Sequence, residues 1–293
     1  MTAPTRLGNH ALLLAMIGGW GASYAAIKAA LTDLTAPGLV AARFTIGALC
    51  VLPFALAGGL AALRQAAAGG AITGLALGSG YLLQAYGMRS TTASMGGFIA
   101  GLIPILVAAG GWILFRARPG RRGTVGLLLG LAGLVVLVWP TELGSGLNST
   151  EGIVLQLGAA LSFACHVLLI SHFGARVPLM PFCLWQLALV AVGASAAVAL
   201  GSGLAVGDAP LFTLRLGALM AFLAVLCTGI GIALQSRVQP RVPPLHVALL
   251  FTTQPLFAAL TGWATLGESL GARDFAGAAL IIAGVVVTSL DRR

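Results

Sequence analysis

Residues 78–88 read GSGYLLQAYGM, and residues 229–239 read GIGIALQSRVQ. A shift of 151 positions superposes the two stretches and places Gln84 on Gln235. The same shift aligns further identical residues of several types: Gly78 with Gly229, Gly80 with Gly231, Leu83 with Leu234, Pro104 with Pro255, Gly111-Trp112 with Gly262-Trp263, Gly126 with Gly277 and Gly133 with Gly284. Glycine matches arise readily by chance in a chain with 41 glycines, but the glutamine, proline and tryptophan matches in one register indicate an internal duplication. Nearer the start of each half a shift of 143 fits better, with Trp20 over Phe163 and Arg43 over Gln186.

The composition places the chain in a lipid bilayer. Hydrophobic residues make up 59% of it and charged residues 8%, with a mean hydropathy of +1.02. Soluble domains carry about 25% charged residues, so this surface must face lipid. The net charge of +9 does not indicate a nucleic-acid partner, because the arginines lie in short loops between apolar runs. The cysteines also lie in apolar runs without metal-like spacing, so we expect small buried side chains and no metal or cofactor: Cys50, Cys165, Cys183 and Cys227.

Ten apolar stretches approach the length of about 20 residues that a transmembrane helix needs. The expected spans are 10–31, 38–57, 71–88, 93–115, 123–140, 152–172, 181–201, 215–235, 244–265 and 273–290. Arginines in the flanking segments alternate in density between the two sides. One side holds Arg6, Arg64, Arg116, Arg118, Arg121, Arg122, Arg176, Arg237, Arg241, Arg292 and Arg293, and the other holds Arg89, Arg215 and Arg273. This bias predicts that both termini are cytoplasmic.

Each half of the duplication contains five expected spans, which is an odd number. The two copies must therefore cross the membrane in opposite orientations, related by a pseudo-two-fold axis in the membrane plane. We expect an all-α integral membrane protein in which ten transmembrane helices form two inverted five-helix repeats, 1–145 and 146–293, around a central cavity. Such repeats are typical of alternating-access carriers, whose substrate site lies near the midplane. The excess of arginine over lysine is typical of a GC-rich bacterial genome, so we expect a bacterial inner membrane.

Several motifs, each weak alone, give the chain its resemblance to a known family. They are Gly19-Trp20-Gly21 with Lys28, Arg43 early in the second span, Tyr81 to Gly87 leading into Thr91-Thr92-Ala93-Ser94, Pro104 and Pro255, and Leu266-Gly267-Glu268. As a set they resemble the ten-helix, EamA-type members of the drug/metabolite transporter superfamily over nearly the whole chain. Similar members include exporters of amino acids, among them aromatic amino acid exporters of the YddG type. The resemblance implies a central cavity lined by spans 1, 3, 4, 6, 8 and 9.

The first two spans carry the charged and aromatic candidates. Trp20, Tyr24 and Lys28 recur at i, i+4 and i+8, on one face of a helix. The aromatic rings either line the cavity or pack against neighbouring helices, and Lys28 either attracts a carboxylate or reaches toward the interface. Arg43 lies inside the second span, where it needs a partner or water, so a structural role and a substrate contact are equally open.

The other spans supply the uncharged polar candidates. Tyr81 and Gln84 share a face of the third span, and Gln235 takes the place of Gln84 in the second copy, so we expect this pair to line the pathway. Hydrogen bonding between helices is the alternative. For His166 we expect a packed, hydrogen-bonded side chain rather than a proton-sensitive one. Gln254, which shares a helical face with His246 and Leu250, and Phe98 complete the substrate-binding candidates.

Two prolines and two tryptophans have positional interpretations. Pro104 and Pro255 each remove a backbone hydrogen bond within a span, which favours a hinge or a static kink. Trp112 and Trp263 lie at span ends and are expected to be interfacial anchors.

The sequence favours transport over other functions. No His-Glu-x-x-His or Gly-x-Ser-x-Gly motif occurs, so we expect no enzyme, and no filter or charge ring indicates a channel. We expect a lipid-embedded exporter of small metabolites, above all amino acids including aromatic ones. The alternative is a proton-coupled exporter of hydrophobic or cationic drugs or of another metabolite. Every acidic residue lies in a loop or at a span end, which favours facilitated diffusion or exchange. We expect a monomer, with a homodimer as the alternative, because the Gly126/Gly133 and Gly277/Gly284 faces could pack within one chain or between two.

Overall fold

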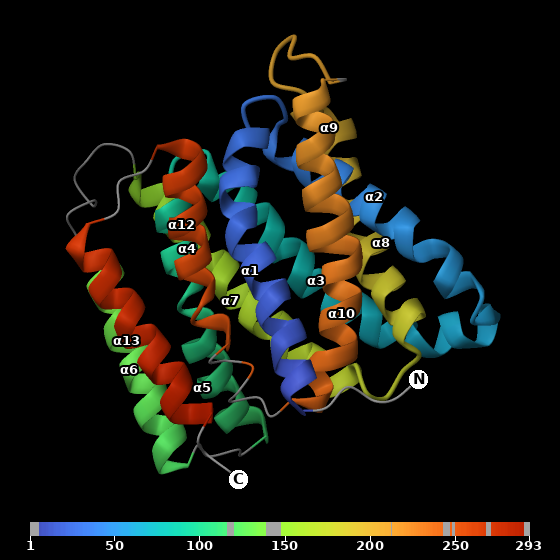
Figure 1. Ribbon diagram of the computed structural model, residues 1–293. Helices are drawn as coiled ribbons and strands as arrows, with labels where there is room; N and C mark the ends of the chain where they lie inside the picture. Colours follow the sequence, from blue (N-terminus) through green and yellow to red (C-terminus); the bar gives the residue numbers. More distant parts are fainter. Residues whose placement is uncertain are drawn as a thin grey trace.

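A chain in lipid must satisfy its backbone hydrogen bonds internally, which favours helices. The computed structural model describes residues 6–115, 120–138, 148–211, 213–242, 247, 250–267 and 271–289, and its regular elements are all helical (Figure 1). Seven helices in these ranges are long and apolar enough to cross a membrane. The all-α membrane class is therefore confirmed. The other three expected spans, 123–140, 244–265 and 273–290, correspond to shorter described helices.

Side-chain caps fix the starts of two helices in the first half. Its elements are α1 (Arg6–Ala30), α2 (Ala36–Leu56), α3 (Gly59–Met88), α4 (Ala93–Ala100), α5 (Ile103–Phe115) and α6 (Arg121–Val138). Thr35 caps α2 by accepting from Gly38 N at 3.0 Å, and Thr92 caps α4 in the same way. The helix predicted to begin at residue 71 begins at Gly59 instead, because the alanine-rich stretch before residue 71 favours helix.

The second half contains a wide helical turn in the middle of a long span. Its elements are α7 (Thr150–Phe173), α8 (Leu179–Ala197), η1 (Val198–Ser202), α9 (Leu214–Met220), η2 (Ala221–Ile230), α10 (Gly231–Val238), η3 (Gln239–Arg241), α12 (Gln254–Leu266) and α13 (Ala272–Ser289). The η2 segment is a π-helix that joins α9 to α10. Thr228 Oγ1 donates to the carbonyl of Leu223, five residues earlier, which fits this wider turn. Wide turns of this kind are frequent at functional sites.

Both predicted hinge prolines lie in the first turn of a helix. The expected fourth span is broken at Gly101 and Leu102, and α5 restarts with Pro104 as its second residue. Pro255 is the second residue of α12. Proline is tolerated there because the first turn needs no N–H donor, whereas further along it would clash with an earlier carbonyl. The two prolines therefore occupy equivalent places in the two halves.

Helices α6 and α13 pack directly against each other through glycines, side by side in Figure 1. A Cβ added to Gly133 would lie 2.6 Å from the carbonyl oxygen of Gly277, and one added to Gly284 would lie 2.5 Å from that of Gly126. Because Gly126 faces Gly284 while Gly133 faces Gly277, the two helices are antiparallel. The glycine faces thus pack within one chain, the first of the two predicted alternatives.

The outside of the bundle is apolar, as lipid requires. Large hydrophobic side chains are exposed, including Leu200, Leu214 and Phe275. Two cysteines, Cys50 and Cys165, also lie on this surface, so the prediction that all four are buried is wrong for this pair. An apolar residue in a membrane helix can face lipid as readily as the interior, so apolar periodicity does not predict burial here. Toward the centre, α1 lies between the α4 and α12 pair and the α9–α10 column (Figure 1).

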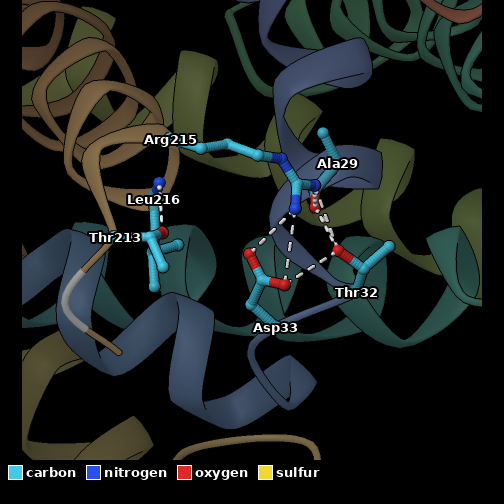
Figure 2. Close-up of polar contacts among 6 residues, drawn as sticks. All are labelled: Ala29, Thr32, Asp33, Thr213, Arg215 and Leu216. Atoms are coloured by element: carbon cyan, nitrogen blue, oxygen red, sulfur yellow. Dashed lines mark hydrogen bonds and ion pairs between the residues drawn. The ribbon is translucent and has the colours of Figure 1, made fainter. Parts of the chain in front are cut away.

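At one end of the bundle the two halves are held together by contacts that we name the loop clasp (residues 31–35 with 203–211 and 213–215). Leu34 pairs with Ala205 in an antiparallel bridge, and Thr35 N donates to the carbonyl of Leu204 at 3.1 Å. Figure 2 shows Arg215 bonded to Asp33 in an ion pair of 3.3 Å, and its Nη2 donates to the carbonyl of Ala29 at 2.7 Å. The clasp therefore joins the end of α1 to the start of α9.

Candidate functional site

A central cavity lies where α1, α3, α5, α7, α10 and α12 converge. Its volume, taken as the space open to the centres of water molecules, is about 40 Å³, which holds roughly three waters. Its walls are aromatic and aliphatic with a few polar groups, as is usual for small-molecule sites. The lining residues are Trp20, Ser23, Tyr24, Leu77, Tyr81, Gln84, Ile103, Phe163, His166, Val167, Ile232, Gln235, Phe251 and Gln254.

Most of the candidates predicted from the sequence meet at this cavity. Those that line it are Trp20, Tyr24, Tyr81, Gln84, His166, Gln235 and Gln254. Lys28, Arg43 and Phe98 do not line it. Pro104 and Pro255 each follow a lining residue directly, Ile103 and Gln254. His246 lies outside the described residues, so its predicted face on the helix with Gln254 is not described.

Trp20 is held in the cavity wall by the wide turn of η2. Its Nε1 donates to the carbonyl oxygen of Cys227 at 2.7 Å, and the residue is 7% exposed. Its ring lies 5.9 Å from that of Phe251, centroid to centroid. The polar edge of the indole is thereby satisfied by backbone, while its apolar body remains available to the cavity.

Arg43 is buried next to the cavity rather than in its wall. It is 1% exposed, its Nε donates to Thr228 Oγ1 at 2.5 Å, and its Nη2 donates to the hydroxyl of Tyr81 at 3.2 Å. The guanidinium carbon lies 4.5 Å from the centroid of the Tyr81 ring, a cation–π arrangement. In the part of the chain that the structure describes, the only ion pair is Arg215 with Asp33, so no described carboxylate neutralises Arg43. The structure gives this arginine hydrogen-bonded partners and places its positive charge behind Tyr81.

Lys28 joins two elements of the first half at the clasp end. Its Nζ donates to the carbonyls of Met88 at 2.8 Å and Thr91 at 2.6 Å. Met88 is the last residue of α3, where carbonyls lack intrahelical partners and the helix dipole favours a cation. Lys28 therefore caps the C-terminal end of α3.

His166 has the packed, hydrogen-bonded environment that we expected. It is 3% exposed, and its Nε2 lies 2.9 Å from Gln186 Oε1. Gln186 Nε2 donates to the carbonyl of Phe182 at 3.2 Å, which turns the amide oxygen toward the histidine. An amide oxygen only accepts, so Nε2 of His166 carries the proton. Tyr24 and the Gln84 side chain are also within hydrogen-bonding reach of each other.

The remaining lining residues were not predicted, although the repeat register points to most of them. Phe163 is the 143-shift equivalent of Trp20, Ile103 the 151-shift equivalent of Gln254, and Ile232 that of Tyr81. Apolar residues gave no chemical signal of their own, so only their symmetric partners could have identified them. Among the described residues, no group of three His, Cys, Asp or Glu side chains could hold a metal ion.

The apolar surface, the helical fold and the central cavity with its aromatic walls and few polar groups are typical of a polytopic membrane transporter. The EamA-like transporter family model matches residues 6–139 and again residues 150–290, so the chain belongs to the EamA-like transporter family. The double match agrees with the resemblance stated above. These findings indicate a transporter rather than an enzyme.

Individual relatives agree with this class. The chain is 27% identical to an uncharacterized transporter of Archaeoglobus fulgidus over 279 residues, which cover 95% of this chain and 84% of the relative. A crystal structure of a protein with 20% identity matches with a TM-score of 0.78 over 98% of each chain, which supports the fold alone.

Proposed function

We propose that the chain carries small metabolites by alternating access through the central cavity, which two inverted five-helix repeats enclose. The observation that carries this proposal is the pairing of the lining residues. Twelve of the fourteen form six pairs under the two sequence shifts: Trp20 with Phe163, Ser23 with His166, Tyr24 with Val167, Tyr81 with Ile232, Gln84 with Gln235 and Ile103 with Gln254. A cavity on a pseudo-two-fold axis has this property, because each half then contributes equivalent positions.

The contact between α6 and α13 supports the same symmetry. Gly133 and Gly284 are equivalent under the 151 shift, as are Gly126 and Gly277. Gly133 packs on Gly277 while Gly284 packs on Gly126, so exchanging the halves reproduces the contact. Such self-complementary pairing is the mark of a two-fold axis. The antiparallel packing of these two equivalent helices supports opposite orientations of the two copies, which the proposed repeats of 1–145 and 146–293 with ten spans require.

The prolines supply positions where each repeat can flex. The helix breaks before Pro104, and Pro255 lies in the first turn of α12, next to the lining residues Ile103 and Gln254. A change of angle at either break would move a cavity wall directly. A hinge of this kind absorbs a backbone change in a few residues while the helices on both sides stay rigid.

The chemistry of the cavity walls suits an amino acid with an apolar or aromatic side chain, which the cavity can admit only by widening from its volume of about 40 Å³ in this conformation. Five of the lining residues are aromatic: Trp20, Tyr24, Tyr81, Phe163 and Phe251. Three glutamine side chains provide hydrogen bonds, and the buried charge of Arg43 behind Tyr81 attracts an anionic group. We propose export from a bacterial cell through its inner membrane, with both termini cytoplasmic, by facilitated diffusion.

Counterflow in reconstituted vesicles tests this function. Vesicles preloaded with unlabelled L-phenylalanine should take up external labelled L-phenylalanine transiently and saturably without a pH gradient. Accumulation that requires a pH gradient would contradict facilitated diffusion. Failure of counterflow with every amino acid, alongside uptake of a cationic drug such as ethidium, would reject the proposed substrate class.

Two isoleucines on one segment provide a matched pair of variants for this assay. Ile232 lines the cavity and is 1% exposed, whereas Ile230 is 53% exposed on the outside. Ile232→Trp should fill a cavity of about 40 Å³ and abolish counterflow, and Ile230→Trp should leave it intact. Equal activity of the two variants would remove the cavity from the transport pathway.

A further inference from the structure

Two glutamine residues of the cavity lining carry buried side-chain oxygens that lack a hydrogen-bond donor. The Oε1 atoms of Gln235 and Gln254 are buried and without a partner, and the two residues are 1% and 6% exposed. Both residues line the cavity. Because an unpaired buried polar atom is costly, each oxygen marks a place where a ligand can donate a hydrogen bond.

The orientation of the Gln235 amide is fixed by a chain of hydrogen bonds outside the cavity. Gln239 Nε2 donates to the carbonyl of Val167 at 2.8 Å, so the oxygen of Gln239 must face the other way. That oxygen accepts from Gln235 Nε2 at 2.8 Å. A backbone carbonyl cannot donate, so neither amide can reverse without losing a bond, and Gln235 is left with its oxygen unpaired.

The charge around the cavity restricts which donor fits. Its described lining includes no acidic residue, and the buried charge of Arg43 lies directly behind the lining residue Tyr81, on which its guanidinium stacks. A ligand with a net positive charge would be repelled by Arg43 and would meet no carboxylate. A ligand that also carries an anionic group offsets its own charge and is attracted by the arginine, while the rings of Trp20 and Phe251 favour the ammonium.

We propose that the amide oxygens of Gln235 and Gln254 form a subsite for the primary amino group of a zwitterionic substrate. Gln239 is a positioning residue, since it holds the Gln235 oxygen available. This inference rests on the proposed function and goes beyond it, because it says which group of the substrate binds at which part of the cavity. The carboxylate of the substrate lies on the Tyr81 side.

Calorimetric binding to the purified full-length protein tests the subsite with three probes that share a phenyl ring. L-phenylalanine carries the amine and the carboxylate, 3-phenylpropionate lacks the amine, and N-acetyl-L-phenylalanine has it blocked. L-phenylalanine should bind about tenfold or more tightly than the other two, as expected for a hydrogen-bonded charged group. Equal binding of L-phenylalanine and 3-phenylpropionate, or binding of none of the three, would overturn the subsite.

Variants test which residues produce the preference for L-phenylalanine over 3-phenylpropionate. Gln235→Leu and Gln254→Leu should each reduce the preference for L-phenylalanine over 3-phenylpropionate, and Gln239→Leu should do so in part. Gln156→Leu is the matched control, because Gln156 is equally buried but does not line the cavity, and it donates to the backbone carbonyl of Gln84 rather than to a side chain in the cavity wall. If Gln235→Leu, Gln254→Leu and Gln239→Leu all keep the preference of the unaltered protein, as Gln156→Leu should, the assignment is wrong.

Because a variant can lose binding simply by misfolding, a second variant is chosen that should gain affinity for one probe. Gln235→Glu places a negatively charged oxygen in the same position. It should therefore raise the affinity for phenethylamine, which has no carboxylate, relative to the affinity for L-phenylalanine. An unchanged ratio would count against the subsite. Counterflow separates this inference from the function beneath it. If L-phenylalanine counterflow persists while the variants leave amine discrimination unchanged, only the subsite fails, whereas absence of counterflow with every metabolite rejects the transporter proposal itself.

Discussion

Weakening the loop clasp should open its end of the protein more often. In alternating access, the contacts that join the two halves at one end must break when that end opens. The clasp joins Asp33 of the first half to Arg215 of the second, and Arg215 also donates to the carbonyl of Ala29. Replacing either Asp33 or Arg215 by alanine removes the ion pair without touching the cavity lining.

The size of the effect follows from the exposure of the pair. The side chain of Arg215 is 55% exposed and that of Asp33 18%, so their ion pair contributes about 0.5 kcal/mol rather than the larger value of a buried pair. The bond from Arg215 to the carbonyl of Ala29 raises the total to about 1 kcal/mol. Since 1.4 kcal/mol is a tenfold change, the ratio of open to closed protein should rise about fivefold in Arg215→Ala.

Thiol labelling measures this ratio. A cysteine at Ser23, in the cavity wall, is introduced after Cys50, Cys165, Cys183 and Cys227 are replaced. A membrane-impermeant reagent applied from the clasp side should label it about fivefold faster in Arg215→Ala, and adding Asp33→Ala should give little more. Arg176→Ala is the control, because Arg176 contacts His172 in its own half. Unchanged labelling in the single variants, or fully additive effects in the double variant, would refute the role of the clasp.

Three further substitutions test the packing around the cavity by thermal unfolding in detergent. Trp20→Phe keeps an aromatic ring but loses the N–H that donates to the carbonyl of Cys227 in η2. The buried carbonyl left without a donor should lower the free energy of unfolding by about 1–3 kcal/mol, and an unchanged unfolding midpoint would contradict this. Arg43→Lys cannot reproduce the forked bonds to Thr228 and Tyr81 and should cost about 1.5–3 kcal/mol, whereas full stability would show that any cation suffices. Gly284→Leu forces α6 from α13 and should cost about 1–3 kcal/mol or more, while Gly193→Leu, which meets nothing, should be neutral; equal effects would count against the close packing.

Much of this architecture was predictable because lipid constrains a sequence strongly. The positions of the spans follow from apolar length, and the glutamine pair Gln84 and Gln235 could be placed at one cavity from the repeat register alone. Polar residues within spans are few, so each one is informative. The start of α3 could not be predicted from hydropathy, because an alanine-rich extension is helical without being strongly apolar.

The roles of the charged candidates depended on partners far away in the sequence. Lys28 shares a helical face with Trp20 and Tyr24 in the sequence. Its Nζ caps α3 through the carbonyls of Met88 and Thr91, a contact that this spacing does not reveal. Arg43 bonds Thr228, which lies 185 residues away. No local pattern reveals such contacts. The clasp was missed for the same reason, since its residues lie in loops with no apolar periodicity.

The most direct test of the account is to lock the clasp covalently. Leu34 and Ala205 form an antiparallel bridge, which places their Cα atoms at a spacing suited to a disulfide. In protein without its native cysteines, Leu34→Cys with Ala205→Cys should bind L-phenylalanine when oxidised but show no counterflow, and reduction should restore it. If the oxidised protein carries L-phenylalanine as fast as the reduced protein, the two halves do not separate at this end and the alternating-access account is wrong.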